Sequence, residues 1–446
     1  MRAVRALLVA AALLGAALSG AGCSERARSN PFDPANPTTG GMPAGLLALA
    51  QNGLVTLRWS PASAPGLLGY QVFRSLAPAS GYAAISSVLA PTTAEFIDRG
   101  LLNGTDHYYR LYFVFDTGLG AQFASDVATP GPLTPWVIED NTSAPALDRL
   151  SADGRHIAER IRGAVTYSAT DVDVDRTTGA VWTCDRYSGV TIYQPATATL
   201  THAVGSLSDP VAVAVDPVDH TAWVGDNGFG QVAHFAVDGS VANPPVILPF
   251  EGPIGIAIDP NDESVWICER NGSRVRHARR DGVPLATAFV VNPSRVAVDS
   301  VSGEAWVTSV STSRILRLSP TGQRSDSVSS IAGPLGIVVD GLRGRIWVTA
   351  PQAGLVVALS RAGATEFVVH GLAGASDVAL DHTTGEVWVS VETAGAVVRI
   401  APDGRILRWT GGFETPNGIA LDPGTGAGPR PAVPTRRSGT GRRSRN

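Results

Sequence analysis

An aspartate followed seven residues later by a tryptophan recurs six times in this 446-residue chain. Successive copies of the pair lie about 40 to 43 residues apart. A repeat of this period predicts an architecture in which one supersecondary unit is arrayed many times. The six pairs are Asp175 and Trp182, Asp216 and Trp223, Asp259 and Trp266, Asp299 and Trp306, Asp340 and Trp347, and Asp381 and Trp388.

Each copy of the repeat predicts four antiparallel strands. In residues 211–226 (VAVAVDPVDHTAWVGD), alternating apolar positions indicate a first strand, the aspartate opens a turn, and the tryptophan belongs to a returning strand. A further strand such as QVAHFAV (231–237) follows, and Asp-Gly or Thr-Gly then marks a hairpin to a fourth strand. Four strands per unit, in a chain with 49 glycines and 31 prolines for its turns, favour the blade of a β-propeller.

These units resemble the repeats of the NHL and streptogramin-lyase-like propeller families over residues 132–422, and we count seven blades. Trp136 adds a seventh returning strand, and PNGIALD, ending at Asp422, adds a seventh first strand. The two sets are offset by one unit, so each leaves one strand without a partner. We therefore expect Pro416 to Asp422 to pair as the innermost strand of the blade that begins at Trp136.

Residues 42–131 follow a different pattern, with about seven short segments rich in β-branched and aromatic residues between turns. This pattern predicts a small β-sandwich. Trp59 before Ser-Pro, Tyr70 within GYQVFRS, and Tyr109 resemble the fibronectin type III family, which implies that Trp59 and Tyr70 are core residues. His107 stands where that family has its corner tyrosine, so we expect a weaker corner hydrogen bond. The predicted fold is therefore all-β, a seven-bladed β-propeller preceded by a fibronectin type III sandwich.

The first residues are a targeting segment. Arg2 and Arg5 precede an apolar run over residues 6–18, then small residues, then Cys23. This order resembles a bacterial lipoprotein signal, which implies a signal peptide over residues 1–22 and a lipid on Cys23. Plain secretion with cleavage after Ala21 is the alternative. Residues 23–41 are polar and rich in Pro, Asn and Gly, which predicts a disordered tether. We expect the protein in the bacterial cell envelope, as a lipoprotein of the outer membrane or one that faces the periplasm. Exposure at the cell surface is a further option.

The other end of the chain, residues 423–446, is rich in arginine and breaks the repeat, so we expect a disordered tail. A nucleic-acid arm is the alternative for this tail. An exported protein with a net charge of −4 gives no reason to expect nucleic acid as a partner. The expected partners are the membrane, through the lipid anchor, and a protein, small-molecule or glycan ligand of unknown identity. The chain is expected to be a monomer.

Most repeated residues have structural interpretations. The seven tryptophans are expected to pack between blades, and the aspartates to hold their turns. Cys184 and Cys268 occupy equivalent positions with one blade between them, which predicts two buried free thiols. No HExxH, GxSxG or Walker motif occurs, and no catalytic residue is assigned. The eight histidines are expected not to recur at a repeat position, and none stands at an inner-strand start, where streptogramin lyases need one.

One weaker pattern predicts a ligand or metal site. In a propeller, inner strands begin and returning strands end on the same face. Four residues with acidic side chains lie three positions after a tryptophan, and four polar residues lie at inner-strand starts. Converging carboxylates suit Ca²⁺ or another divalent cation, or a cationic ligand, whereas a solvated acidic loop ring without a cofactor is the structural alternative. The candidate residues are Glu139, Asp185, Asp226 and Glu269, and Asp171, Arg295, Asp377 and Asn417.

Three functions remain open. The first is a membrane-anchored binding or interaction protein that displays its propeller loops, with the type III domain as a spacer. The second is a metal-dependent, lactonase-like or lyase-like enzyme with its site in the propeller channel. The third is a scaffold within an envelope assembly. Since fold alone does not decide function, the side chains at the channel must do so.

Overall fold

The computed structural model describes residues 42–63, 65–140, 144–166, 168–203, 205–242, 249–328 and 331–423. The expected signal peptide, tether, Cys23 and nearly all of the expected tail therefore lie outside the described residues. The chain divides into two compact units, one built on strands β1 to β7 and the other on strands β8 to β34. Among the described residues, no helix has the length and apolar character needed to cross a membrane.

The first unit consists of two antiparallel sheets. Alternating burial along its strands places every second side chain inside, as the period of a half-buried strand requires. One sheet has the order β1 (Ala44–Gln51), β2 (Leu54–Ser60), β5 (Glu95–Arg99), and the other has the order β4 (Ala83–Ala84), β3 (Leu67–Ser75), β6 (His107–Phe115), β7 (Gly118–Ala128).

Aromatic side chains join the two sheets of this unit. Trp59 of β2 and Tyr70 of β3 are buried, and their ring centroids lie 5.5 Å apart, which confirms both as core residues. Tyr109 of β6 is also buried, and its hydroxyl donates a 2.9 Å hydrogen bond to Asp98, a carboxylate that Arg74 also binds. The tyrosine bond therefore comes from Tyr109, two residues beyond the buried His107.

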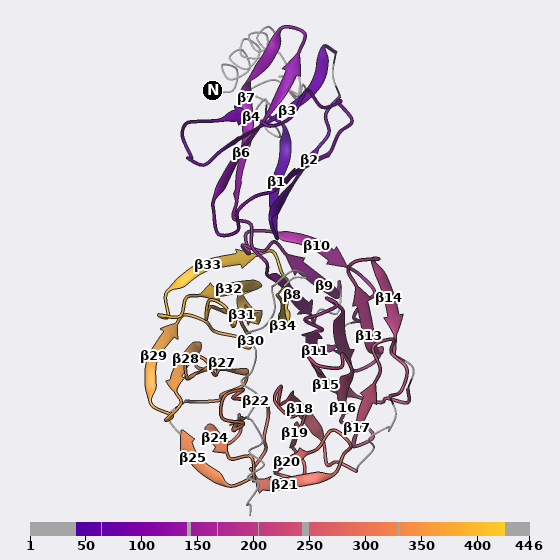
Figure 1. Cartoon of the computed structure of the whole chain (residues 1–446), viewed down its shortest axis with the longest axis vertical. Coiled ribbons are helices and arrows are strands. Elements are labelled where there is room, and N and C mark those ends of the chain that lie inside the picture. Colours follow the sequence, from indigo (N-terminus) through magenta and orange to yellow (C-terminus); the bar gives the residue numbers. More distant parts are fainter. Residues whose placement is uncertain are drawn as a thin grey trace, which may run out of the picture. The chain divides into compact units, whose positions relative to one another are not determined.

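The second unit consists of seven antiparallel sheets in its described residues (Figure 1). Six have four strands; the third has three, extended by an isolated bridge between Phe235 and Val241. From innermost to outermost strand, the sheets are β34 (Pro416–Asp422), β8 (Thr134–Glu139), β9 (Ala146–Leu150), β10 (Ile157–Ile161); β11 (Ala169–Val174), β12 (Val181–Asp185), β13 (Gly189–Gln194), β14 (Thr199–His202); β15 (Pro210–Val215), β16 (Ala222–Asp226), β17 (Gln231–Phe235); β18 (Pro253–Ile258), β19 (Val265–Glu269), β20 (Arg274–Ala278), β21 (Pro284–Phe289); β22 (Val296–Val298), β23 (Ala305–Ser309), β24 (Arg314–Leu318), β25 (Arg324–Val328); β26 (Ile337–Asp340), β27 (Arg345–Ala350), β28 (Leu355–Ser360), β29 (Thr365–His370); and β30 (Ala375–Leu380), β31 (Val387–Val391), β32 (Ala396–Ile400), β33 (Ile406–Gly411). A short 3-10 helix, η1 (Glu392–Ala394), follows β31.

The innermost strands form a closed ring. Each contacts the innermost strand of the next sheet, and β34 contacts both β30 and β11. In Figure 1 the sheets radiate from this ring, with β10, β14, β21, β25, β29 and β33 at the rim. Strand β34 pairs antiparallel with β8, and Ala420 lies opposite Trp136. The expected pairing of Pro416–Asp422 with the Trp136 strand is therefore confirmed, and the chain ends of the unit meet within one sheet.

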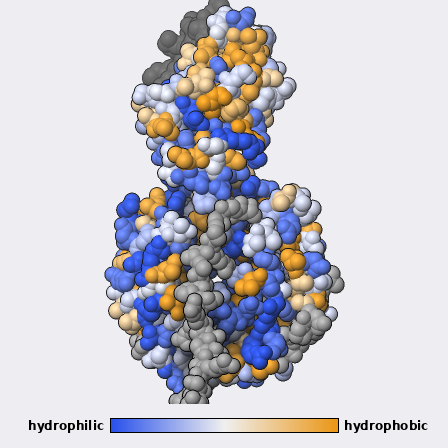
Figure 2. Space-filling model, viewed as in Figure 1, coloured by the Kyte–Doolittle hydropathy of each residue, from blue (hydrophilic) through white to orange (hydrophobic). Residues whose placement is uncertain are grey.

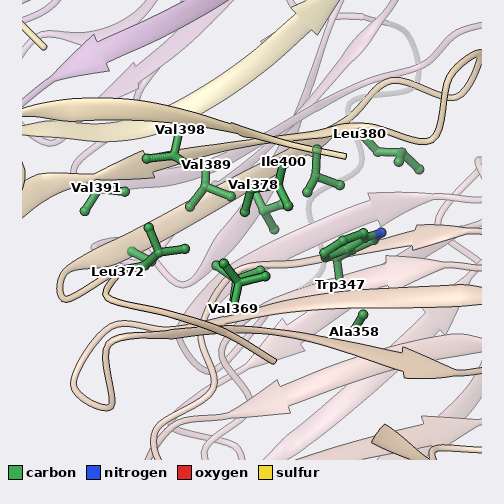
Figure 3. Packing of buried hydrophobic residues seen from close by; sticks show 13 residues of the cluster. Trp347, Ala358, Val369, Leu372, Val378, Leu380, Val389, Val391, Val398 and Ile400 are labelled. Carbon is green, nitrogen blue, oxygen red and sulfur yellow. The ribbon is translucent and has the colours of Figure 1, made fainter. Parts of the chain in front are cut away.

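The repeat tryptophans hold neighbouring sheets together. All seven are at most 1% exposed, and each belongs to a cluster that contains apolar side chains of the following sheet. Figure 3 shows one such cluster, in which Trp347 of β27 packs with Val378 and Leu380 of β30. Trp388 of the last sheet packs with Ile419 and Leu421 of β34, which extends the same contact across the junction. The expected blade-to-blade packing is confirmed.

The turn aspartates are also structural. Each is at most 5% exposed, and five of the six accept a hydrogen bond from the backbone N–H two residues later, as from Thr177 to Asp175 at 2.9 Å. Asp340 accepts instead from the backbone N–H and guanidinium of Arg343. These bonds fix the turn between the first and second strands of each sheet, as expected for aspartate.

The structure confirms the prediction for the cysteines at repeat positions and contradicts the prediction for the histidines. Cys184 and Cys268 are buried and free, as expected, and burial raises the pKa of both thiols. The expectation that no two histidines share a repeat position is wrong, because His234 and His277 lie opposite Trp223 and Trp266 on the neighbouring strand. Their rings stack on the indoles at centroid distances of 4.3 and 4.0 Å. These two histidines therefore serve packing between strands.

Candidate functional site at the mouth of the propeller

One end of the ring carries the predicted site residues. Antiparallel pairing puts the start of each innermost strand opposite the end of the second strand, as where Pro210 of β15 faces Asp226 of β16. We call this end the mouth face; it consists of the loops before the innermost strands and the loops after the second strands. In Figure 2, hydrophilic side chains are spread over the visible side of the propeller, with smaller apolar patches between them.

The four acidic residues that follow a tryptophan by three positions are buried, and their carboxylates already accept hydrogen bonds within the protein. Each is at most 1% exposed and accepts a backbone N–H from the loop that precedes the innermost strand of its own sheet. We call this contact the carboxylate lock. The bonds are Glu414 N–H to Glu139 (2.5 Å), Thr166 N–H to Asp185 (2.7 Å), Ser208 N–H to Asp226 (3.0 Å) and Glu251 N–H to Glu269 (2.8 Å).

Further hydrogen bonds and ion pairs engage the carboxylates of Glu269 and Asp185. Arg274 donates to Glu269 at 2.9 Å, and Arg276 forms a second ion pair with it. Burial alone would raise the pKa of Asp185, but bonds from the Thr166 hydroxyl and from nearby backbone N–H groups lower it. The four acids are therefore neither a solvated ring, as the structural alternative had it, nor oriented toward one common point.

Glu139 differs in having a second acid beside it. Arg160 binds both Glu139 and Asp148, each at 2.7 Å. Burial and the adjacent Asp148 raise the pKa of Glu139 despite this partner. One guanidinium therefore bridges two carboxylates within one sheet, at strands β8, β9 and β10.

The last three sheets use hydroxyl groups in place of the locks. Three residues after their tryptophans stand Ser309, Ala350 and Val391. One position earlier, a hydroxyl side chain donates to a backbone carbonyl of the following sheet. Sequence reasoning missed these groups, although the motif Trp-Val-Thr or Trp-Val-Ser is visible in all three copies. The bonds are Thr308 to Leu335 (2.8 Å), Thr349 to Ser376 (3.2 Å) and Ser390 to Asn417 (2.9 Å).

The four polar residues at inner-strand starts bond to the backbone of other innermost strands. Asp171 accepts the Val213 N–H at 3.0 Å, and Asp377 accepts the Ile419 N–H at 3.1 Å. The Asn417 amide donates to the Ala169 carbonyl at 3.1 Å, and the Arg295 guanidinium approaches the Ile254 carbonyl at 3.3 Å. All four thus connect one sheet to another around the central axis.

Arg295 also reaches across the axis. Its guanidinium lies 3.5 Å from Asp171, although the sheets of β15 and β18 stand between those of Asp171 and Arg295 along the ring. Burial raises the pKa of Asp377 to about 6, and the charge of Arg295 opposes the rise. Burial likewise raises the pKa of Asp171, again against Arg295. The structure therefore brings Asp171, Arg295 and Asp377 into one electrostatic group.

Asp173 belongs with these residues and was missed. It lies two positions after Asp171 and so on the same side of β11. Its carboxylate accepts the Val215 N–H at 2.8 Å, and burial raises its pKa to about 6. The alternation Asp-Val-Asp-Val carries the signal in the sequence. Within the described part of the chain, no three His, Cys, Asp or Glu side chains are grouped as a metal ion would require.

Comparisons with known proteins show the fold. No family model matches the chain, and no curated protein matches it. Among solved structures, it is similar to a functionally unknown protein from Desulfotomaculum acetoxidans, with 18% identity and a TM-score of 0.54 over 65% of this chain and 98% of the other. It is also similar to a streptogramin B lyase, with 18% identity and a TM-score of 0.50 over 57% of this chain and 87% of the other. The chain is therefore an all-β protein with a propeller-like fold.

Proposed function

We propose that this chain is an exported, lipid-anchored protein that binds a ligand at the mouth face of a seven-bladed propeller without turning it over. The observation that carries the proposal is the engagement of the inner-strand residues. Asp171, Arg295, Asp377 and Asn417 bond to the backbone of other innermost strands, so their polar groups support the ring. The loops around them supply an open surface on a rigid support, which suits recognition.

The alternative is a lactonase-like or lyase-like enzyme that uses a divalent cation in the channel. Two observations favour keeping it: the likeness in fold to a streptogramin B lyase, and the raised pKa of Asp171 and Asp377 beside one arginine. In that function, Asp377 and Asn417 would contact the substrate or cation. Fold likeness alone does not carry an activity from one protein to another.

Incubation of the purified full chain with lactone and streptogramin substrates, with and without divalent metals, separates the two functions. We expect no turnover under either condition. Turnover that disappears in Asp377→Ala or Asn417→Ala would overturn the binding proposal and establish the enzyme. The matched control is Asp403→Ala, an exposed acid on a hairpin.

Anchoring is tested separately. The proposal includes a lipid on Cys23, a spacer role for the β1–β7 unit as a fibronectin type III domain, and a monomeric protein in the bacterial cell envelope. Cys23→Ser should move the protein from the membrane fraction to the soluble fraction, because the variant lacks the residue that carries the lipid. A variant that fractionates like the wild type, or a mature chain beginning at Gly22, contradicts the anchor and leaves the binding surface unaffected.

A further inference from the structure

A cavity opens on the mouth face between three neighbouring sheets. Its volume is about 490 Å³, within the range of small-molecule sites in proteins. Its walls come from loops of the β18–β21, β22–β25 and β26–β29 sheets, and they include Arg270, Val310, Leu335 and Pro351. The cavity therefore lies apart from the inner-strand residues to which the enzyme alternative assigns chemistry.

Two of the loops at this cavity, those before β22 and β26, belong to sheets without a carboxylate lock. The loop before β22 is held by bonds to β23, in which the Ser309 hydroxyl donates to the Val291 carbonyl at 2.7 Å and the Ser294 N–H donates to the Thr308 carbonyl at 2.8 Å. The loop before β26 faces Ala350, which has no polar side chain to offer. Neither loop thus has, three positions after the tryptophan of its own sheet, an acidic side chain that could bind its backbone.

Arg270 is a charge in this cavity that is available to a ligand. Within the described part of the chain, its guanidinium has no ion pair, whereas Arg186 at the equivalent position binds Asp209 at 2.9 Å. Burial lowers the pKa of Arg270, and repulsion from Arg295 and Arg186 lowers it further. Arg270 is therefore a cation beside the cavity without an ion-pair partner among the described residues, which an anionic ligand would supply.

The rest of the cavity combines an apolar wall with a few polar groups. Val310, Leu335 and Pro351 are half-buried and supply the apolar surface. Asn292 and Gln352 are exposed amides at the rim. Asn292 has a φ of 45°, a left-handed backbone conformation that is uncommon outside glycine and is enriched at functional sites. A mostly apolar cleft with one convergent charge is the usual form of a small-ligand site.

We propose that this cavity binds a small organic carboxylate, with the carboxylate on Arg270 and an apolar chain against Val310, Leu335 and Pro351. Arginine suits this role because its planar fork can donate two parallel hydrogen bonds to a carboxylate. The inference rests on the proposed binding function and deepens it by naming the ligand class and the residue that reads it.

Calorimetric titration of the full chain with octanoate tests the proposal. Acetate supplies the head without the chain, octanol the chain without the head, and inorganic phosphate another anion. We expect octanoate to bind at least tenfold more tightly than acetate, octanol or phosphate. Equal binding of octanol would overturn the role of the charge, and equal binding of acetate or phosphate would overturn the role of the apolar wall.

Substitutions at two positions assign the site. Arg270→Ala should weaken octanoate binding at least tenfold, and Arg270→Lys should restore part of it. Ser311→Glu, at an exposed position of the cavity, should also weaken binding by adding a negative charge. Arg405→Ala removes an exposed arginine from a hairpin and serves as the control, with unchanged binding expected. Octanoate binding that is absent, or unchanged in both cavity variants, would overturn the proposal.

The outcome is separable from that of the proposed function. Octanoate is neither a lactone nor a streptogramin, and Arg270 is not among the inner-strand residues. Loss of the carboxylate site would leave ligand binding elsewhere on the mouth face open. Turnover that depends on Asp377 would refute the binding proposal while leaving the octanoate result as it stands.

Discussion

The first four sheets of the propeller and the last three use different side chains to hold the segments at the mouth face in place. In the sheets of β34, β11, β15 and β18, a buried carboxylate binds the loop ahead of the innermost strand. In the sheets of β22, β26 and β30, a hydroxyl one position earlier binds the following sheet. The backbone plan is the same in both groups, since each pairs its strands in the same order.

The difference shows that acidic side chains around a propeller mouth need not form a ligand site. A carboxylate offers several acceptor sites to the loop ahead of its own sheet, whereas a hydroxyl accepts one backbone N–H of its own sheet and donates to one carbonyl of the next sheet. The carboxylate acts within one sheet, whereas the hydroxyl acts both within its own sheet and between sheets. The comparison therefore predicts that their removal has unequal effects, and that the strand joining the two groups matters most.

Truncation of that strand should have the largest effect. A chain ending at residue 414 lacks β34, so β8 loses its ladder partner and Ile419 and Leu421 no longer cover Trp388. Each of these side chains contributes roughly 1.5–3 kcal/mol when fully buried. We expect a fall of many degrees in the melting temperature, or loss of soluble expression, measured by thermal denaturation. A chain ending at residue 424 is the control and should melt like the full chain; equal melting of both would contradict closure by β34.

Removal of one carboxylate lock should come next. Glu269→Ala leaves the Glu251 N–H and two arginines without their buried acceptor. Loss of one partner from a buried ion pair costs about 3–5 kcal/mol, and we expect the lower end because both arginines are partly exposed. Urea denaturation measures the loss. Glu269→Gln, which keeps an acceptor, should recover part of it, and a loss below that of a hydroxyl variant would break the comparison.

The Asp377 carboxyl should give stability a pH dependence. Its pKa of about 6 lies above its ordinary value of 3.8, so the folded chain binds the proton more tightly between these two values. Stability from this group is present at low pH and is lost as pH rises through about 6. Asp377→Asn does not titrate and keeps an acceptor for the Ile419 N–H.

The free energy of unfolding should be measured for both proteins at pH 4 and pH 7. Between pH 4 and pH 7, the free energy of unfolding of the variant should rise by about 1–3 kcal/mol relative to that of the wild type, because the pKa of Asp377 is raised from 3.8 to about 6. Asp171 and Asp173 are present in both proteins, so the difference reports Asp377 together with its interaction with Asp171. An offset that is the same at both pH values would show that Asp377 is not desolvated, and Asp403→Asn should show no such change.

Removal of one hydroxyl should have the smallest effect. Thr308→Val keeps the shape of the side chain and removes both its donor to the Leu335 carbonyl and its acceptor for the Arg295 N–H. A net hydrogen bond is worth about 0.5–1.5 kcal/mol, and we expect a loss equal to one or two such bonds in urea denaturation. Thr312→Val, on the neighbouring loop, removes a hydroxyl that donates to the Ser309 hydroxyl of the same sheet and provides the comparison. A loss as large as that of Glu269→Ala would erase the distinction between the two groups of sheets.

The sequence was sufficient for the repeat and insufficient for the site. Periodicity located the strands, the packing of Trp136 to Trp388, and the pairing of β34 with β8, because these follow from local alternation and counting. Side-chain partners do not follow from spacing. Glu269 is bound to a residue 18 positions earlier, and Arg295 reaches a residue 124 positions away, contacts that only the folded ring creates.

The missed residues differ in how visible they were. Asp173 and Thr308 stand at repeat positions and could have been selected by asking which polar side chains share a strand face. Arg270 could not, since its value to a ligand depends on the lack of a partner where Arg186 has one. The histidines were misjudged because their shared place is set by the cross-strand pairing with tryptophan and not by the first two strands.

The pairing of β34 with β8 also sets an order of events as the chain is made. Trp136 leaves the ribosome 280 residues before Pro416, so six sheets can form while β8 still waits for its neighbour. Contacts between such distant residues form slowly, because a long loop must close first. During that interval β8 keeps one unpaired edge, so the last strand to be made completes the first sheet of the unit.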